Sequence, residues 1–338
     1  MADFAAPYRR ELLAHCYRML GSVHDAEDAV QETLLRAWQA REGFEGRSSL
    51  RVWLYRIATN ACLRIVERRV RLPLPSGLGA PGHDQDVPGA DATAEARWLE
   101  PIPAGTLAGG GSGAGDPATA AADRASIRLA FVSALQLLPA RQRAALILRE
   151  VYAFSAQETA EILETSVGAV NSALQRARAQ IAATAPREDD VLEPSEPDSR
   201  RQVERYMHAF EHSDIEGLTR ILRDDVVLEM PPHPTWFLGR EDVARFLAQR
   251  IELEGRHMRM LPIEANGQAG VASYVRATAL HGQQPATGAG TPDASGESGE
   301  WRAHAIHVLA PTRAGLGRIS VFLDTGLFAV FDLPPYLT

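Results

Sequence analysis

The sequence contains no lysine, so all 35 of its basic residues are arginine. Cysteine is scarce as well, with only Cys16 and Cys62, and aromatic residues make up 7% of the chain. No apolar run reaches the ~18 residues of a membrane-spanning helix, and the charged start MADFAAPYRRELL lacks the apolar core of a signal peptide. These absences argue against a membrane protein and a disulfide-stapled secreted domain. We therefore expect a cytoplasmic protein with two buried, reduced thiols.

Charge is distributed unevenly along the 338 residues. Residues 1–71 and 124–187 are basic, with net charges of +3 and +4, whereas the segments 72–123, 188–200 and 201–338 carry −6, −5 and −4. The overall net charge of −8 therefore conceals two small basic segments beside acidic ones. Such asymmetry is typical of a nucleic-acid binder with an appended module.

Composition also marks the boundaries between domains. Residues 72–123 include PLPSGLGAPG and AGGGSGAGD, which cannot bury enough apolar area to offset their ordering entropy. Within that segment, residues 98–101 (Trp-Leu-Glu-Pro) are the one anchor-like site. A second acidic linker is expected at 188–200, and residues 281–300 are expected to form a long loop. The sequence therefore predicts domains at 1–71, 124–187 and 201–338.

Residues 154–181 have the pattern of two helices joined by a tight turn. Ser155 and Glu158 form the S-x-x-E signature of a capping box, and Ser166 is expected to cap the second helix. That helix has one apolar stripe, formed by Val170, Leu174, Ala177 and Ile181. Two helices in this arrangement place the second in a DNA major groove. An ordinary helical hairpin remains the alternative from this stretch alone.

Three amphipathic helices are expected in the first segment, at 8–20, 24–38 and 48–69. The second has an acidic side. The third carries Trp53, Arg56, Asn60 and Arg64 outside its main apolar stripe. Arginine, asparagine and aromatic side chains suit single-stranded bases, because rings stack on bases and arginine binds phosphate. The alternative is a solvated arginine face with Trp53 in the core, since tryptophan is highly buried on average.

The last segment has an α+β pattern. Helices are expected at 202–222 and 241–253, and strands at 226–230, 257–263, 270–275, 301–309 and 318–324. Asn266-Gly267 is a strong hairpin signal. His304 and His307, three apart in a strand, should point to opposite faces, and His208 and His212 should be solvated. The sequence therefore predicts no metal site, and we expect no cofactor.

Four collinear stretches of the chain resemble known families. DAEDAVQETLLRAW, FEGRSSLRVWLYRIATNACLRIVERR and LQLLPARQRAALILREVYAFSAQETAEILETSVGAVNSALQRARAQI resemble RNA polymerase sigma factors of the extracytoplasmic-function class. RYMHAFEHSDIEGLTRILRDDVVLEMPPHPTWFLGREDVARFL is similar to the start of a SnoaL-like domain. The resemblance implies a multidomain chain: two all-α sigma domains, namely a region-two helical bundle and a region-four helix-turn-helix, followed by an α+β SnoaL-like cone.

The resemblance also implies partners and roles for particular residues. The partners would be the β and β′ subunits of the RNA polymerase core and promoter DNA. The residues that would dock on the polymerase are Asp25, Glu27, Asp28, Gln31 and Glu32. Those that would hold the melted −10 element are Trp53, Arg56, Asn60 and Arg64. At the −35 element, the base-reading candidates are Asn171, Ser172 and Gln175, and the phosphate-binding candidates are Arg176 and Arg178.

Two other functions remain open from the sequence. One is a helix-turn-helix repressor or activator that works outside the polymerase, although it would not need the 25–38 motif. The other is a SnoaL-like enzyme with a DNA-binding appendage, in which the mouth of the cone would be lined by His233, Trp236, His304 and Asp324. No phosphate loop, nucleophile elbow or Cys-His metal motif occurs. We therefore expect a sigma factor that is not an enzyme, regulated by its last domain; an anti-sigma partner or a small ligand stays open.

Overall fold

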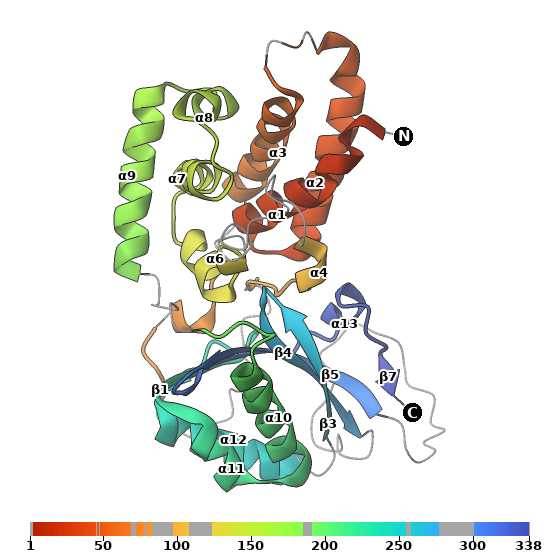
Figure 1. The fold of residues 1–338 in the computed structure, drawn as a ribbon, viewed down its shortest axis with the longest axis vertical. Coiled ribbons are helices and arrows are strands. Elements are labelled where there is room, and N and C mark those ends of the chain that lie inside the picture. The colour runs from red at the N-terminus through yellow and green to blue at the C-terminus, as the bar shows by residue number, and fades with distance from the viewer. Residues whose placement is uncertain are drawn as a thin grey trace. The chain divides into compact units, whose positions relative to one another are not determined.

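The computed structural model describes residues 3–44, 46, 48–68, 72–77, 79–82, 97–107, 124–184, 191–254, 258–276 and 301–337. The chain forms two compact units (Figure 1). The first comprises Met1–Leu74 and Glu95–Glu188, and the second comprises Pro75–Ala94 and Asp189–Thr338. The expected loop at 281–300 and most of the first linker lie outside the described residues. None of the helices in the described ranges combines the length and apolar character that a membrane span requires.

The first part of unit 1 contains three long helices, as the apolar spacing predicts. A 3-10 turn (Asp3–Tyr8) leads into α1 (Arg9–Leu20), α2 (Val23–Ala40) and α3 (Leu50–Glu67). Gly21, with a φ of 71°, ends α1, and the Ser22 hydroxyl accepts a hydrogen bond from the Asp25 amide at the start of α2. Ser49 caps α3, so this helix begins two residues after the expected start at residue 48. Cys16 and Cys62 are buried free thiols, as expected.

The second part of unit 1 contains the helix-turn-helix. Its helices are α4 (Ala104–Leu107), α6 (Leu129–Gln136), α7 (Ala140–Leu146) with a π-helical turn (Ile147–Val151), α8 (Ala156–Ile162) and α9 (Val167–Thr184). The predicted capping box is confirmed. Ser155 accepts from the Glu158 amide at 3.1 Å, and Glu158 accepts from the Ser155 amide at 2.8 Å. The Ser166 hydroxyl accepts from the Ala169 amide at the start of α9, as the sequence predicts.

Unit 2 is a curved sheet covered by helices. Its strands are β1 (Leu222–Glu229), β2 (Trp236–Leu238), β3 (Met258–Ala265), β4 (Gln268–Arg276), β5 (Trp301–Thr312), β6 (Gly315–Phe322) and β7 (Tyr336–Leu337). The order is β2-β1-β6-β5-β4-β3, with β7 beside β5, and β1 is parallel to β6. The helices are α10 (Pro197–His212), α11 (Ile215–Ile221), α12 (Arg240–Glu254) and α13 (Leu327–Val330). In Figure 1, α10, α11 and α12 lie together on one side of the sheet, where the apolar core forms.

Several boundaries of unit 2 differ from the predictions. The single helix expected at 202–222 is two helices, because Ser213 adopts a left-handed φ of 58° and Asp214 caps α11 through the Gly217 amide. Part of the expected second linker is ordered, since α10 begins at Pro197 and Val191 pairs with Thr312. The short strand β2 was not predicted. The Asn266-Gly267 hairpin is confirmed, with φ values of 54° and 64° that suit this turn.

Candidate nucleic-acid interface

The resemblance assigns one face of α2 to polymerase binding, and only some of the residues on that face are exposed. Glu27, Asp28 and Gln31 are exposed, and Glu32 is partly buried. The prediction that Asp25 belongs to this exposed face is wrong. Asp25, in the first turn of the helix, is 5% exposed, and one of its carboxylate oxygens lies 3.7 Å from the Arg97 guanidinium. The sequence pattern did not indicate that Arg97 would lie beside this turn.

Glu32 connects the polymerase-binding candidates to the −10 candidates. Its Oε1 lies 2.6 Å from the Arg36 guanidinium, one helical turn away, and 3.4 Å from that of Arg64 on α3. Arg56, Asn60 and Arg64 are partly exposed and repeat every four residues, so they share one face of α3. This polar stripe has the chemistry that a single strand of DNA requires.

Trp53 lies in the core in this structure. It is 7% exposed, and its ring centroid lies 4.9 Å from that of Phe44. Its indole face is therefore covered by another ring and not open to a stacked base. The burial of Trp53 agrees with the alternative that it is a core residue, and the roles of Trp53 and of the polar stripe of α3 at the −10 element stay predictions.

The −35 candidates lie on the exposed side of α9. Asn171, Ser172, Gln175, Arg176 and Arg178 are all exposed, while Val170, Leu174 and Ala177 are at most 6% exposed. The helix thus buries its apolar stripe and leaves polar side chains for a groove. Arg178 makes an ion pair with Glu150. Since the side chains of Arg178 and Glu150 are 60% and 43% exposed, water screens this pair, and a phosphate can replace the carboxylate.

Within unit 1, buried arginines join the two helical parts, which the sequence did not predict. Arg18 of α1 donates to the Tyr152 hydroxyl at 2.7 Å and to Ser126 Oγ at 2.7 Å. Arg143 of α7, which is 3% exposed, donates to the Met19 carbonyl and to Gln136 Oε1. We call the contacts that join the first three helices to the residues from 124 onward the seam; they include those of Arg18 with Ser126 and Tyr152 and that of Arg143 with Met19.

Aromatic rings complete the seam. The ring centroid of Tyr55 on α3 lies 5.0 Å from those of His15 and Tyr152, and 4.8 Å from that of Phe154. Burial, followed by the positive charge of Arg18, lowers the pKa of His15 to about 3, and burial raises the pKa of Tyr152 to about 12. Both groups are therefore neutral at pH 7. The seam packs α3 against α8, the first helix of the helix-turn-helix.

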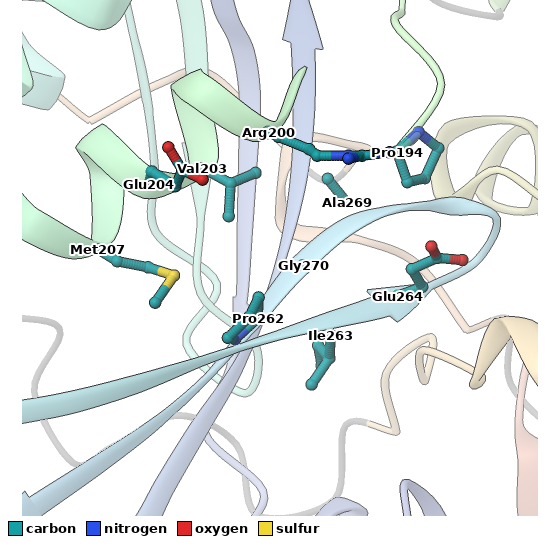
Figure 2. Close-up of a pocket in the computed structure, with 10 residues that line it drawn as sticks. All are labelled: Pro194, Arg200, Val203, Glu204, Met207, Pro262, Ile263, Glu264, Ala269 and Gly270. Carbon is teal, nitrogen blue, oxygen red and sulfur yellow. The ribbon is translucent and has the colours of Figure 1, made fainter. Parts of the chain in front are cut away.

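Unit 2 contains a cavity of about 500 Å³ between α10 and the β3–β4 hairpin (Figure 2). Val203 and Met207 of α10 face Pro262 and Gly270 across it, and Arg200 lies at its edge. The residues predicted to line the mouth of the cone do not line this cavity: His233, Trp236, His304 and Asp324. Their positions on β2, β5 and the loops after β1 and β6 place them at other parts of the sheet.

Two of these four side chains make local hydrogen bonds, and their predicted place at the mouth of the cone stays a prediction. The Trp236 indole N–H donates to the Gly79 carbonyl at 3.2 Å, and Asp324 accepts from the Gly326 amide at 2.8 Å. Partial burial, followed by the charge of Arg250, lowers the pKa of His233. Among the residues that the structure describes, no group of three or more potential metal ligands occurs.

A polar chain that the sequence did not reveal lies inside unit 2. Tyr206 Oη is 2.9 Å from His307 Nδ1, and His307 Nε2 is 3.0 Å from Ser273 Oγ. Because the Ser273 hydroxyl donates to the Ala305 carbonyl, His307 Nε2 carries the proton and Nδ1 accepts from tyrosine. Burial, then the charge of His304, lowers the pKa of His307 to about 3. These residues are at most 4% exposed, so the chain stabilises the core.

Family models match all three parts of the chain. The model for Sigma-70 region 2 matches residues 4–72, that for Sigma-70 region 4 matches 128–181, and that for the SnoaL-like domain matches 203–310. The first match covers the helices α1 to α3, the second covers the helix-turn-helix, and the third covers most of unit 2. The order of the matches is the order expected from the sequence.

Known proteins with similar sequences or folds agree with these matches. The ECF RNA polymerase sigma factor SigG of Mycobacterium tuberculosis is 44% identical over 99% of this chain and 85% of its own length. SigW of Bacillus subtilis is 27% identical over 52% of this chain and 84% of its own. The crystal structure of M. tuberculosis SigJ has the same fold, with a TM-score of 0.58, 22% identity, and coverage of 98% of this chain and 99% of that one. The chain therefore belongs to the extracytoplasmic-function (ECF) sigma factors of RNA polymerase and carries a C-terminal SnoaL-like domain.

Proposed function

We propose that this sigma factor, which binds core RNA polymerase and directs initiation at −10 and −35 promoter elements, does so through three particular surfaces. The observation that carries this assignment is the exposed polar face of α9 in a helix-turn-helix whose two helices both begin with a side-chain cap. A polar face over a buried apolar stripe is what a recognition helix needs. The other two surfaces are the exposed part of α2 and the polar stripe of α3.

On α9, Asn171 and Gln175 lie one helical turn apart and are both exposed. Each primary amide can make a bidentate contact with adenine in the major groove, and Ser172 can bond to either kind of base edge. Arg176 and Arg178 bind the flanking phosphates and set the register of the helix. On α3, Asn60 reads a base edge, and Arg56 and Arg64 hold the backbone of the melted strand.

On α2, polymerase contact is assigned to Glu27, Asp28 and Gln31, with Glu32 at the border. Exposed acidic side chains favour a basic partner by electrostatic steering and hydrogen bonding. Because Glu32 of α2 pairs with Arg64 of α3, the surface assigned to polymerase lies next to the surface assigned to the −10 element. Asp25 is left out of the assignment because its side chain is 6% exposed.

The C-terminal domain modulates initiation and is not an enzyme. The polar chain formed by Tyr206, His307 and Ser273 is enclosed, and a fold alone carries no catalytic activity. An acidic domain tethered to two basic segments of the same chain has a high effective concentration toward them. A small ligand or an anti-sigma factor could act through it. The protein works in the cytoplasm, where its polymerase is.

Reconstitution tests this proposal. Full-length protein and core polymerase are combined on fragmented genomic DNA, and the transcript starts are sequenced. We expect starts downstream of one shared pair of −35 and −10 sequences, and several-fold altered output from a chain truncated after Pro186, with the same −35 preference. Starts without a shared motif would refute the reading role of α9, and unchanged output after truncation would refute the modulating role.

A further inference from the structure

The cavity of unit 2 lies at one edge of the sheet. Its lining residues come from α10, from β3 and β4, and from the segment before α10. In the strand order, β4 and β3 are the last two strands, and α10 packs over both of them, whereas α12 packs against β1 and β2 at the other edge. The cavity is therefore a separate site from the predicted mouth of the cone.

Small residues at the start of β4 leave this space open. Ala269 and Gly270 line the cavity with no more than a methyl group and a hydrogen atom. A β-carbon at Gly270 would lie 2.7 Å from the His307 carbonyl oxygen, so a larger residue does not fit there. Glu264, the partner of Ala269 in the β3–β4 register, is exposed. The resulting volume of about 500 Å³ is in the range of small-molecule sites, about 300–1,000 Å³.

Backbone hydrogen bonds fix both ends of the cavity. At one end, one turn of α10 beyond the lining residue at position 207, Glu211 accepts from the Met260 amide of β3 at 2.9 Å. At the other end lies Pro194, whose segment is held on the sheet by the Leu192 amide, which donates to the Pro311 carbonyl at 2.8 Å. Figure 2 shows Pro194 and the α10 residues around the same space. The walls are thus set by the fold.

The free edge of β3 does not suit an added peptide strand. Residues two apart in a strand direct their backbone groups to the same side. On the side of β3 away from β4, the Met260 amide is already bonded to Glu211, and Pro262 has no amide hydrogen. An extended peptide would therefore lack two successive donors along this edge. A small molecule, which needs no strand pairing, fits the site better.

The lining is apolar, with charged groups only at its rim. On α10, Arg200, Val203, Glu204 and Met207 share one face, because they are three or four residues apart. Val203 is 7% exposed and Met207 packs against the core of the domain. Methionine is unbranched and flexible, so it adapts to ligands of different shape. Burial of apolar surface is therefore the main source of affinity at this site.

The rim selects for a positive charge. Glu204 and Glu264 are exposed, and within the described part of the chain neither carboxylate takes part in a hydrogen bond or an ion pair. Arg200, although one turn from Glu204, instead donates to the Ser195 carbonyl at 2.8 Å. The three charged groups sum to one negative charge. Since exposed charges interact weakly, this charge decides between ligands more than it adds affinity.

We propose that this cavity binds a small apolar molecule that carries a protonated amine. The apolar body lies between α10 and the β3–β4 hairpin, and the ammonium group lies beside Glu204 and Glu264. The site goes beyond the modulating role assigned above and does not depend on it, because the proposal rests on the geometry of unit 2 alone. Binding to the free, full-length protein therefore tests it separately from transcription.

Three probes with the same alkyl chain separate the apolar contribution from the charge. They are n-octylamine, 1-octanol and octanoate, which are cationic, neutral and anionic at pH 7, each used below its micellar concentration. The full-length protein is labelled with ¹³C in its methionine methyl groups, and Met207→Leu identifies the resonance of Met207. Titration of this resonance gives a dissociation constant for each probe.

Two paired variants and one blocking variant locate the site. Glu204→Gln combined with Glu264→Gln removes both rim charges. Glu216→Gln combined with Glu241→Gln is the matched control, because these two carboxylates are exposed on α11 and α12 and do not line the cavity. Val203→Trp fills the space with a large side chain, and thermal denaturation checks that this variant is folded.

We expect octylamine to bind about fivefold or more tightly than octanoate, with octanol between them. The rim variant should lose this difference, the control should keep it, and Val203→Trp should bind none of the probes. Absence of a saturable shift of Met207 with octylamine would refute the site. Equal binding of octylamine and octanoate, or an equal loss in the control, would refute the ligand class. Unchanged binding by folded Val203→Trp would refute the location, and if that variant is unfolded, the Met207 shift and the rim variant still decide.

Discussion

The seam of unit 1 and the exposed face of α9 use arginine in opposite ways. In the seam, Arg143 is 3% exposed and donates to carbonyl oxygens of two helices. On α9, Arg178 is 60% exposed and pairs with a single, solvated carboxylate. Because the chain has no lysine, both tasks fall to the same residue type. Burial, and not residue identity, separates a structural arginine from one available to DNA.

The largest expected effect comes from removing a seam arginine. Arg143→Ala leaves the Met19, Gln136 and Leu138 carbonyls without this donor. We expect a loss of about 3–5 kcal/mol in the free energy of unfolding, because each orphaned buried group is costly. Urea denaturation followed by circular dichroism measures it. Arg178→Ala is the control and should change stability by no more than about 0.5 kcal/mol; equal losses would remove the distinction between the two regions.

Acid should weaken the seam and leave the α9 face unchanged. His15 has a pKa of about 3 in the folded protein, below its value near 6.5 in the unfolded chain, so below pH 6.5 the unfolded chain binds more protons. The contribution of His15 to the free energy of unfolding is therefore complete above pH 6.5 and decreases as the pH drops toward 3. At pH 5 the loss is about 2 kcal/mol. Denaturation curves at pH 7.5 and 5 measure it.

The pKa of His307 in unit 2 is also lowered to about 3, so acid should destabilise unit 2 in the same direction as unit 1. It therefore provides an internal comparison for the acid effect. The variant His15→Asn should reduce the pH dependence of unit 1 and leave that of unit 2. A pH-independent stability of both units between 7.5 and 5 would show that neither histidine is held neutral by burial.

A smaller effect is expected on base discrimination. Gln175→Ala should relax base choice at one or two adjacent −35 positions, since a bidentate amide–adenine contact contributes ~1–3 kcal/mol of discrimination. The measurement is transcription by holoenzyme from a library of randomised −35 sequences. The stability of the variant should match that of the unmodified protein, because the side chain is exposed. Unaltered base preference would exclude Gln175 from direct reading.

The smallest effect is expected for the phosphate contact. Arg178→Ala should weaken holoenzyme binding to all promoters evenly and reduce the slope of log affinity against log salt by about one. Binding of fluorescent promoter DNA at several salt concentrations measures this slope. Glu150→Gln, which frees Arg178 from its carboxylate, should strengthen binding slightly. A change of base preference in Arg178→Ala would mean that phosphate and base contacts on α9 were assigned wrongly.

Local patterns predicted most of the fold. The capping box at Ser155 and Glu158, the second cap at Ser166 and the Asn266-Gly267 hairpin involve residues a few positions apart, so their hydrogen bonds are decided by the chain itself. The exposed candidates on α9 followed from the same helical periodicity. Local patterns did not predict the burial of Asp25, whose carboxylate lies 3.7 Å from the Arg97 guanidinium, and they left open whether Trp53, which packs beside Phe44, is a core residue.

The sequence by itself determined the order of the domains, the helix-turn-helix and the family, because motifs and periodicity are short-range properties. Only the tertiary structure decided which charged residues are buried. Arg18 meets Tyr152 across 134 positions, and Glu229 meets Ser76 across 153. Such pairs leave no local signature, since neither residue differs in sequence from a solvated one. Their burial becomes necessary only when the fold brings a donor and an acceptor together away from water.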